Sequence, residues 1–205
     1  FDKVMENPYI KTKYDREKRI KEKKQYIKDY LPEVHGGEPK NILDIGPGPG
    51  EFMEICRWYG HDVWGVDAMK GDCEMGEEYL ELSMLMNERQ KLDVWNWGAR
   101  MVFTEDISFP FPPVNIVNCQ GAIEQIFKDH LEGPPHIEHH DARQLSWIES
   151  DKLNEDFLKF FSGIDEILAP GGILLIYANG AKNTIKYHNL LMATMDKLNY
   201  KNVFS

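Results

Sequence analysis

An apolar segment that runs directly into closely spaced glycines constrains the fold of this chain more than any other feature. Residues 41–45 form a short, mostly apolar run typical of a buried strand, and Gly46, Gly48 and Gly50 follow at alternate positions. Glycine lets the backbone turn tightly and approach a ligand closely, and the N–H groups that begin a helix are donors to such a ligand. The segment therefore predicts a strand, a ligand-binding turn and a helix in succession.

Strand and helix patterns alternate along the chain. Short apolar runs typical of strands occur at 41–45, 63–66, 100–103, 114–118 and 173–177. Segments typical of helices occur at 14–31, 52–59, 76–92, 153–168 and 184–198. Alternation of this kind predicts an α/β fold in which helices cover both faces of a parallel sheet.

The N-terminal segment differs from the remainder in charge. Residues 1–30 contain ten Lys or Arg and six Asp or Glu, a net charge of +4. Because the whole chain has a net charge of −10, the remaining residues carry a net charge of −14. A break with Gly and Pro at 35–39 separates this segment from the first strand. We expect an N-terminal helical cap and linker at 1–38 and one domain at 39–205. We also expect the domain to continue past residue 205, because a bare sheet edge invites association.

Composition limits the partners and the compartment. An acidic body repels a phosphate backbone, so we expect no nucleic-acid partner. No segment approaches the roughly 18–20 consecutive apolar residues of a membrane span. The three cysteines are too few and too scattered for a disulfide framework. We therefore expect a cytoplasmic protein without a membrane partner, and its oligomeric state stays open.

Two aspartates mark the first two expected strands. Asp44 lies inside the first strand, where burial without a partner is costly, so it suits holding the glycine turn or a ligand ammonium. Asp67, followed by Ala68, ends the second strand, where a carboxylate can accept hydrogen bonds from both hydroxyls of a ribose. The alternative role for Asp67 is to cap the following helix.

Polar residues also follow the third and fourth expected strands. Glu105 and Asp106 come just after 100–103, where a carboxylate can accept a hydrogen bond from an adenine amino group. Asn118 ends the run 114–118. Because ligands of open α/β sheets bind outside the carboxyl ends of the strands, we expect these side chains to lie near one site.

The glycine turn, Asp67, Asp106 and the turn Ala169-Pro170-Gly171-Gly172 resemble, in their order and spacing, the class I S-adenosylmethionine (SAM)-dependent methyltransferases. The resemblance covers residues 40–198. It implies a Rossmann-like sheet, SAM as the cofactor, and methyl transfer to an acceptor that we expect to be a small molecule. The cofactor-binding residues that it implies are Asp44, Gly46, Gly48, Gly50, Asp67, Ala68, Glu105, Asp106 and Asn118.

The acceptor side departs from known patterns. Residues 118–121 lack the proline pair and aromatic residue of amino-directed nucleic-acid methyltransferases, and a glutamine replaces the histidine that follows Glu124 in many small-molecule members. A long connection at 127–150 contains His130 and His136, which are candidates for a general base because histidine titrates near neutral pH. Glu124 is a candidate polar contact to the acceptor. We expect exposed histidines on this connection rather than a metal site.

Two other functions fit the same glycine turn. A nicotinamide-dependent oxidoreductase is the alternative from another enzyme class, because dinucleotide enzymes use similar turns. A SAM-binding partner subunit without catalysis is the other, because it would keep an intact cofactor site. The methyl acceptor and the atom methylated are not identified by these residues.

Overall fold

The computed structural model describes residues 6–12, 14–67, 77–96, 112–123, 151–177 and 184–201. Its centre is a five-stranded sheet in the order β3-β2-β1-β4-β5, in which every neighbouring pair is parallel. The strands are β1 (Asn41–Ile45), β2 (Asp62–Asp67), β3 (Asp93–Asn96), β4 (Val114–Gln120) and β5 (Leu168–Tyr177). The α/β fold with a parallel sheet is thereby confirmed.

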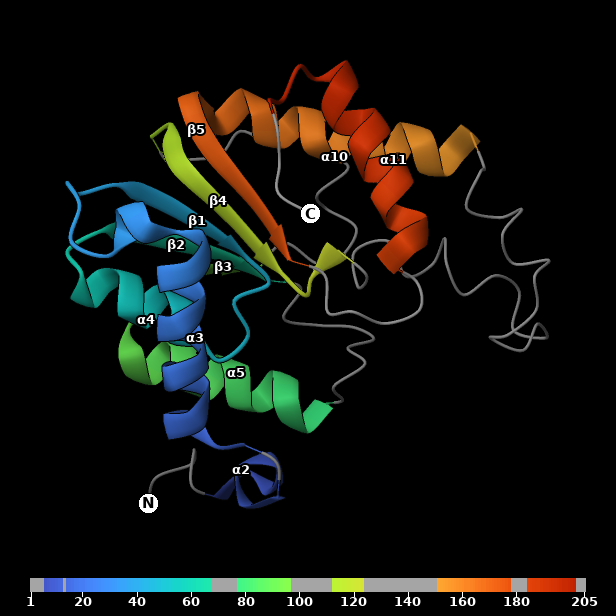
Figure 1. Cartoon of the computed structure of the whole chain (residues 1–205). Helices are drawn as coiled ribbons and strands as arrows, with labels where there is room; N and C mark the ends of the chain where they lie inside the picture. The colour runs from blue at the N-terminus through green and yellow to red at the C-terminus, as the bar shows by residue number, and fades with distance from the viewer. Residues whose placement is uncertain are drawn as a thin grey trace, which may run out of the picture.

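Helices cover both faces of this sheet (Figure 1). The described helices are α2 (Pro8–Thr12), α3 (Arg16–Tyr30), the 3-10 turn η1 (Pro32–Val34), α4 (Glu51–Trp58), α5 (Glu77–Gln90), α10 (Asp151–Ile167) and α11 (Thr184–Lys197), of which α2 lies away from the sheet, beyond α5 (Figure 1). Figure 1 shows α3 and α4 on one side of the sheet and α10 and α11 on the other. Within the described ranges, none of the helices combines the length and the apolarity that crossing a membrane requires.

Alternate residues of β1 face opposite layers, as the period of a strand dictates. Leu43 and Ile45 lie in one hydrophobic cluster with the phenylalanines of α10, whereas Ile42 lies in the other cluster with Phe52 of α4. Asp44 shares the side of Ile42 and is 2% exposed. Burying a large apolar side chain contributes about 1.5–3 kcal/mol to the stability of the fold. Because the apolar residues on both faces of β1 are buried, the carboxylate of Asp44 between them is also held in the interior, beneath α3 and α4.

The helix α3 is part of the core rather than a separate layer outside it. Asp15 caps its start, because its side chain accepts a hydrogen bond of 3.0 Å from the N–H of Lys18. Tyr26 and Ile27 are buried among residues of α4, β1 and β4, while Tyr30 on the same helix is 50% exposed. The division of the chain at residues 38 and 39 stays a prediction, but the cap segment and the sheet share one core.

Two strands differ by more than two residues from their expected bounds. The strand that pairs with β2 is β3, Asp93–Asn96, and the expected strand at 100–103 lies outside the described residues. The last strand begins at Leu168 rather than at 173, because the pairing with β4 jumps across the expected Pro-Gly-Gly turn. Gly171, with φ at +75°, lies within that irregularity, so the turn is accommodated as a bulge of β5.

Candidate functional site

The carboxyl ends of β1, β2 and β4 bring three predicted residues together. Asp44 and Asn118 are register partners on neighbouring strands, and the side-chain Nδ2 of Asn118 donates to Oδ1 of Asp44 over 2.7 Å. Asp67 is the last residue of β2, and its Oδ2 accepts a hydrogen bond of 3.2 Å from the N–H of Gly48. These polar groups surround the start of the glycine turn, which is the position that the sequence predicts.

The turn between β1 and α4 requires its glycines. Gly46, Gly48 and Gly50 have φ values of +72°, +54° and +85°, in the left-handed region that favours glycine. A Cβ at Gly46 would lie 2.7 Å from the Cβ of Ala122, and a Cβ at Gly48 would lie 2.5 Å from the hydroxyl of Tyr79. Both the conformation and the close approach of neighbouring side chains therefore exclude a larger residue.

The backbone donors of this turn are all used within the protein. The N–H of Gly46 donates to the carbonyl of Val66 over 2.8 Å, and the N–H of Gly50 donates to the carbonyl of Pro47 over 3.1 Å. The N–H of Gly48 donates to Asp67, and the two intervening prolines have no N–H. Residues 46–50 therefore offer no backbone donor to a phosphate group.

The carbonyls of the same turn are held by α5. The side-chain amide of Asn87 donates to the carbonyl of Gly48 over 3.0 Å, and that of Gln90 donates to the carbonyl of Pro49 over 3.2 Å. Sequence reasoning missed both residues, because an amide on a helix gives no sign of which loop it will meet. The turn is thus fixed from both sides before any ligand binds.

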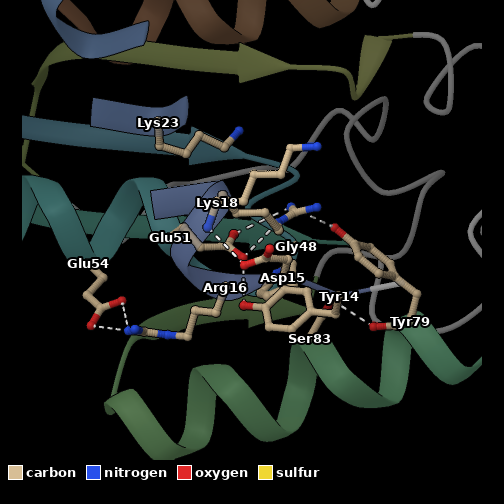
Figure 2. Close-up of polar contacts among 12 residues, drawn as sticks. Tyr14, Asp15, Arg16, Lys18, Lys23, Gly48, Glu51, Glu54, Tyr79 and Ser83 are labelled. Atoms are coloured by element: carbon tan, nitrogen blue, oxygen red, sulfur yellow. Dashed lines mark hydrogen bonds and ion pairs between the residues drawn. The ribbon is translucent and has the colours of Figure 1, made fainter. Parts of the chain in front are cut away.

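A buried acid begins α4. Glu51 is fully buried, and its Oε1 accepts hydrogen bonds from the Tyr14 hydroxyl over 2.7 Å and from Nε of Arg19 over 2.8 Å. Nη2 of Arg19 also donates to the Tyr79 hydroxyl over 3.4 Å, next to Gly48 (Figure 2). Burial and the Glu51 carboxylate raise the pKa of Tyr14, so its hydroxyl stays a donor. This cluster joins α3, α4 and α5 around the turn.

Asp44 has an altered proton affinity. Its complete burial raises the pKa of its carboxyl to about 7, although the hydrogen bond from Asn118 and the charge of Lys23 oppose the rise. Tyr26 of α3 completes the chain of hydrogen bonds, because its hydroxyl donates to Oδ1 of Asn118 over 2.8 Å. A cation brought close to Asp44 would lower this pKa and favour the carboxylate.

The remaining predicted residues lie outside the described part of the chain. Those expected to bind the cofactor are Ala68, Glu105 and Asp106, and those expected to act on the acceptor are Glu124, His130 and His136. Among the described residues, no three His, Cys, Asp or Glu side chains gather as metal ligands would.

Arg19 and Glu51 are site residues that sequence reasoning did not single out. A weak signal existed for Glu51, because an acid directly after the last glycine of the turn lies at the positive end of the next helix. No signal marks Arg19 among the other cations of α3, since its partner lies 32 residues away along the chain. Arg19 meets Glu51 only because α3 packs against α4.

Solved structures with a similar fold include a SAM-dependent methyltransferase and a decarboxylase. A SAM-dependent methyltransferase from Archaeoglobus fulgidus matches with a TM-score of 0.53 and 17% identity, over 95% of this chain and 73% of that one. Precorrin 8W decarboxylase from Methanobacterium thermoautotrophicum matches with a TM-score of 0.50 and 12% identity, over 86% and 72%. Neither a family model nor a curated protein sequence matches the chain.

At these identities the similarity establishes the fold. A further match is a protein from Pyrococcus horikoshii, with a TM-score of 0.46 and 16% identity. This match covers 80% of the present chain but only 58% of the length of the Pyrococcus protein. Together with the strand order and the glycine turn after β1, the comparison with the Archaeoglobus enzyme defines a Rossmann-like fold of the class I SAM-dependent methyltransferase type. This confirms the fold that the resemblance of the sequence predicted.

Proposed function

We propose that the chain is a SAM-dependent methyltransferase whose cofactor binds across the glycine turn. The observation that carries this proposal is the acidic character of the turn and its surroundings. The carboxyl groups of Asp44 and Asp67 border a turn whose own N–H groups are already bonded, and the third carboxyl group nearby, of Glu51, is paired with Arg19. Such a site suits a ligand with an ammonium, a sulfonium and ribose hydroxyls, as SAM has.

The same surroundings oppose a dinucleotide. Dinucleotide enzymes bind the pyrophosphate at the helix that follows the glycine turn, because its N-terminus is electropositive and its N–H groups point at the ligand. Here Glu51 places a carboxylate in the first turn of α4, and residues 46–50 offer no backbone donor. The Asp67 carboxylate and the lack of a backbone donor at residues 46–50 would both oppose a diphosphate there, which supports SAM over NAD.

Each residue of the site has a distinct task in this proposal. Asp67 accepts hydrogen bonds from the ribose hydroxyls, as an acid at the end of β2 can. Asp44 lies beneath the turn and attracts the cationic part of the ligand. SAM, when bound, would supply an electrophilic methyl group on its sulfonium for transfer to an oxygen, nitrogen or carbon of the acceptor. The protein aligns donor and acceptor, which alone can contribute several kcal/mol.

The remaining assignments belong to the same proposal. Ala68, Glu105 and Asp106 would complete the cofactor site. Glu124, His130 and His136 would contact the acceptor, with either histidine as the base where a proton must leave early. The acceptor would be a small molecule rather than a nucleic acid, and the setting the cytoplasm, with residues 1–38 as the cap and 39–205 as the catalytic domain.

Calorimetric titration of the full chain with SAM, S-adenosylhomocysteine and NAD tests the proposal. We expect saturable binding of the first two ligands, with dissociation constants at least about tenfold below that of NAD. NAD binding as tight as that of SAM, or no SAM binding by the folded chain, would overturn it. Incubation with methyl-labelled SAM and fractionated metabolites then tests for transfer of the label.

A further inference from the structure

Lys23 is the one cation of α3 whose amine meets the end of β4. Its Nζ donates a hydrogen bond to Oε1 of Gln120, the last residue of β4, and lies 6.0 Å from the centre of the Tyr26 ring. Figure 2 shows that the side chain extends away from the ion pair of Arg16 and Glu54 lower on the same helix. Lys23 therefore occupies a different place from the cations that hold α4.

The ammonium of Lys23 lacks a close counter-ion within the described part of the chain. No carboxylate there forms an ion pair with it, although Arg16 and Arg19 each have one. Burial lowers the pKa of Lys23, and the more distant charges of Asp44 and Glu51 only partly oppose this effect. A partly buried ammonium that is bonded to a neutral amide gains from any anion that binds beside it.

Aromatic side chains continue this surface toward β5. Gln120 is the register partner of Tyr177, the last residue of β5. The ring of Tyr177 packs against Tyr26 with centroids 5.7 Å apart and against Tyr30 with centroids 6.2 Å apart. Tyr30 and Tyr177 are 50% and 38% exposed, so a ligand held by Lys23 would have aromatic surface within reach.

The strand order sets this place apart from the cofactor site. Asp67 at the end of β2, Asp44 in β1 and Asn118 in β4 mark the proposed cofactor site. Gln120 ends β4 two residues beyond Asn118, and Tyr177 ends β5, which lies on the far side of β4 from β1. A molecule that reaches the ends of β4 and β5 would therefore approach the cofactor from the side of the acceptor.

We propose that Lys23 and the side-chain amide of Gln120 bind a carboxylate of the methyl acceptor, whose apolar body packs against Tyr177 and Tyr30. The inference rests on the proposed methyltransferase function and adds a substrate class to it, carboxylic acids with an aromatic or alicyclic body. Lys23 donates to one carboxylate oxygen, and Nε2 of Gln120 can donate to the other while its Oε1 stays bonded to Lys23.

Benzoate and benzamide are matched probes for this site, because they share a ring and differ in charge. We expect NMR titration of the full chain to give benzoate a dissociation constant at least about tenfold below that of benzamide, as hydrogen bonds to a charged group allow. Lys23→Gln should weaken benzoate binding to the level of benzamide. Lys23→Arg should keep the preference, and Lys24→Gln, a change of an exposed lysine on the same helix, should leave it unchanged.

Several results would overturn the proposal. The first is the absence of benzoate binding at a benzoate concentration of about 10 mM, where even a weak specific complex would form. The second is equal binding of the two probes. The third is unchanged benzoate binding in folded Lys23→Gln. A loss of SAM affinity in that variant would assign Lys23 to the cofactor instead. If wild-type protein binds benzoate but not SAM, the anion site stands and the methyltransferase proposal fails, so the two failures are distinguishable.

Discussion

Asn118 donates a hydrogen bond of 2.7 Å to the carboxyl group of Asp44, its register partner on the neighbouring parallel strand, and both side chains are buried. Tyr26 of α3 donates in turn to Asn118. This chain of side chains joins the helix, β4 and β1 directly below the glycine turn. Protonation of Asp44, or loss of either hydrogen bond, therefore changes the polar groups next to the glycine turn.

Asp44 should make the stability of the free protein depend on pH. Its pKa is about 7 in the folded state and about 3.9 in an unfolded chain. The folded state thus holds the proton more tightly, so the free energy of unfolding falls as the pH rises from about 4 to about 7, by roughly 4 kcal/mol at most. Urea unfolding of Asp44→Asn, which lacks this titration, should show a gain over wild type near pH 8 that is absent near pH 4. Parallel profiles for the two proteins would contradict the assignment.

Tyr26 should stabilise the fold through its hydroxyl as well as its ring. Tyr26→Phe leaves the buried Oδ1 of Asn118 without its donor, and an unsatisfied buried acceptor costs about 1–3 kcal/mol. Tyr30→Phe is the matched control, because Tyr30 is on the same helix and 50% exposed. Chemical denaturation should show the loss in the first variant only, and equal stability of both variants would exclude the bond as a contributor.

The ion pair of Arg19 with the fully buried Glu51 should matter more than the more exposed pair of Arg16 and Glu54, which also joins α3 to α4. Arg19→Met leaves a fully buried carboxylate without its cation, which costs about 3–5 kcal/mol when a buried pair is broken. Arg16→Met removes a pair whose arginine is 40% exposed, and such pairs contribute about 0–1 kcal/mol. The double variant Arg19→Met/Glu51→Gln should recover part of the first loss, and no recovery would show that packing, not charge, sets it.

The glycine turn should tolerate no side chain at residue 48. Gly48→Ala forces an alanine into φ of +54° and brings its Cβ to 2.5 Å from the Tyr79 hydroxyl. Gly60→Ala has φ of +88° with no atom within 4 Å, so it reports the backbone strain alone, about 1–2 kcal/mol. We expect Gly48→Ala to lose more free energy of unfolding than Gly60→Ala, with the excess relieved by adding Tyr79→Phe. An excess that survives Tyr79→Phe would mean that the hydroxyl is not the obstacle.

Much of this fold is readable from the sequence because its central strands are buried on both faces. The interiors of β1 and β2 are largely apolar, as parallel strands covered on both faces are, and β4 carries apolar residues at Val114, Ile116, Val117 and Cys119. Asp44 and Asn118 stand out within these runs. The strand β3, with the sequence Asp-Val-Trp-Asn, contains no such apolar run. It is an edge strand that pairs only with β2, and its Trp95 is 40% exposed, so its burial is too small to mark it.

The contacts between distant segments were not predictable in the same way. Arg19 lies among six other cations within α3, and nothing local distinguishes it from Lys18 or Lys21. Only the packing of α3 on α4 brings its guanidinium to Glu51. Similarly, the amide of Asn87 reaches the carbonyl of Gly48 only because α5 lies along the turn. Residue types thus indicated the cofactor site, and tertiary packing supplied the residues that shape it.

The most direct test of the proposed cofactor site is calorimetric titration of SAM into wild type, Asp67→Ala and Asp62→Ala. The two aspartates are on the same strand, at opposite ends, so only Asp67 lies at the glycine turn. If Asp67 accepts the ribose hydroxyls, its replacement should weaken SAM binding by about 1.5–3 kcal/mol, the range for hydrogen bonds to a charged group. Asp62→Ala should bind as wild type does. Unchanged SAM affinity in a folded Asp67→Ala protein would contradict the account.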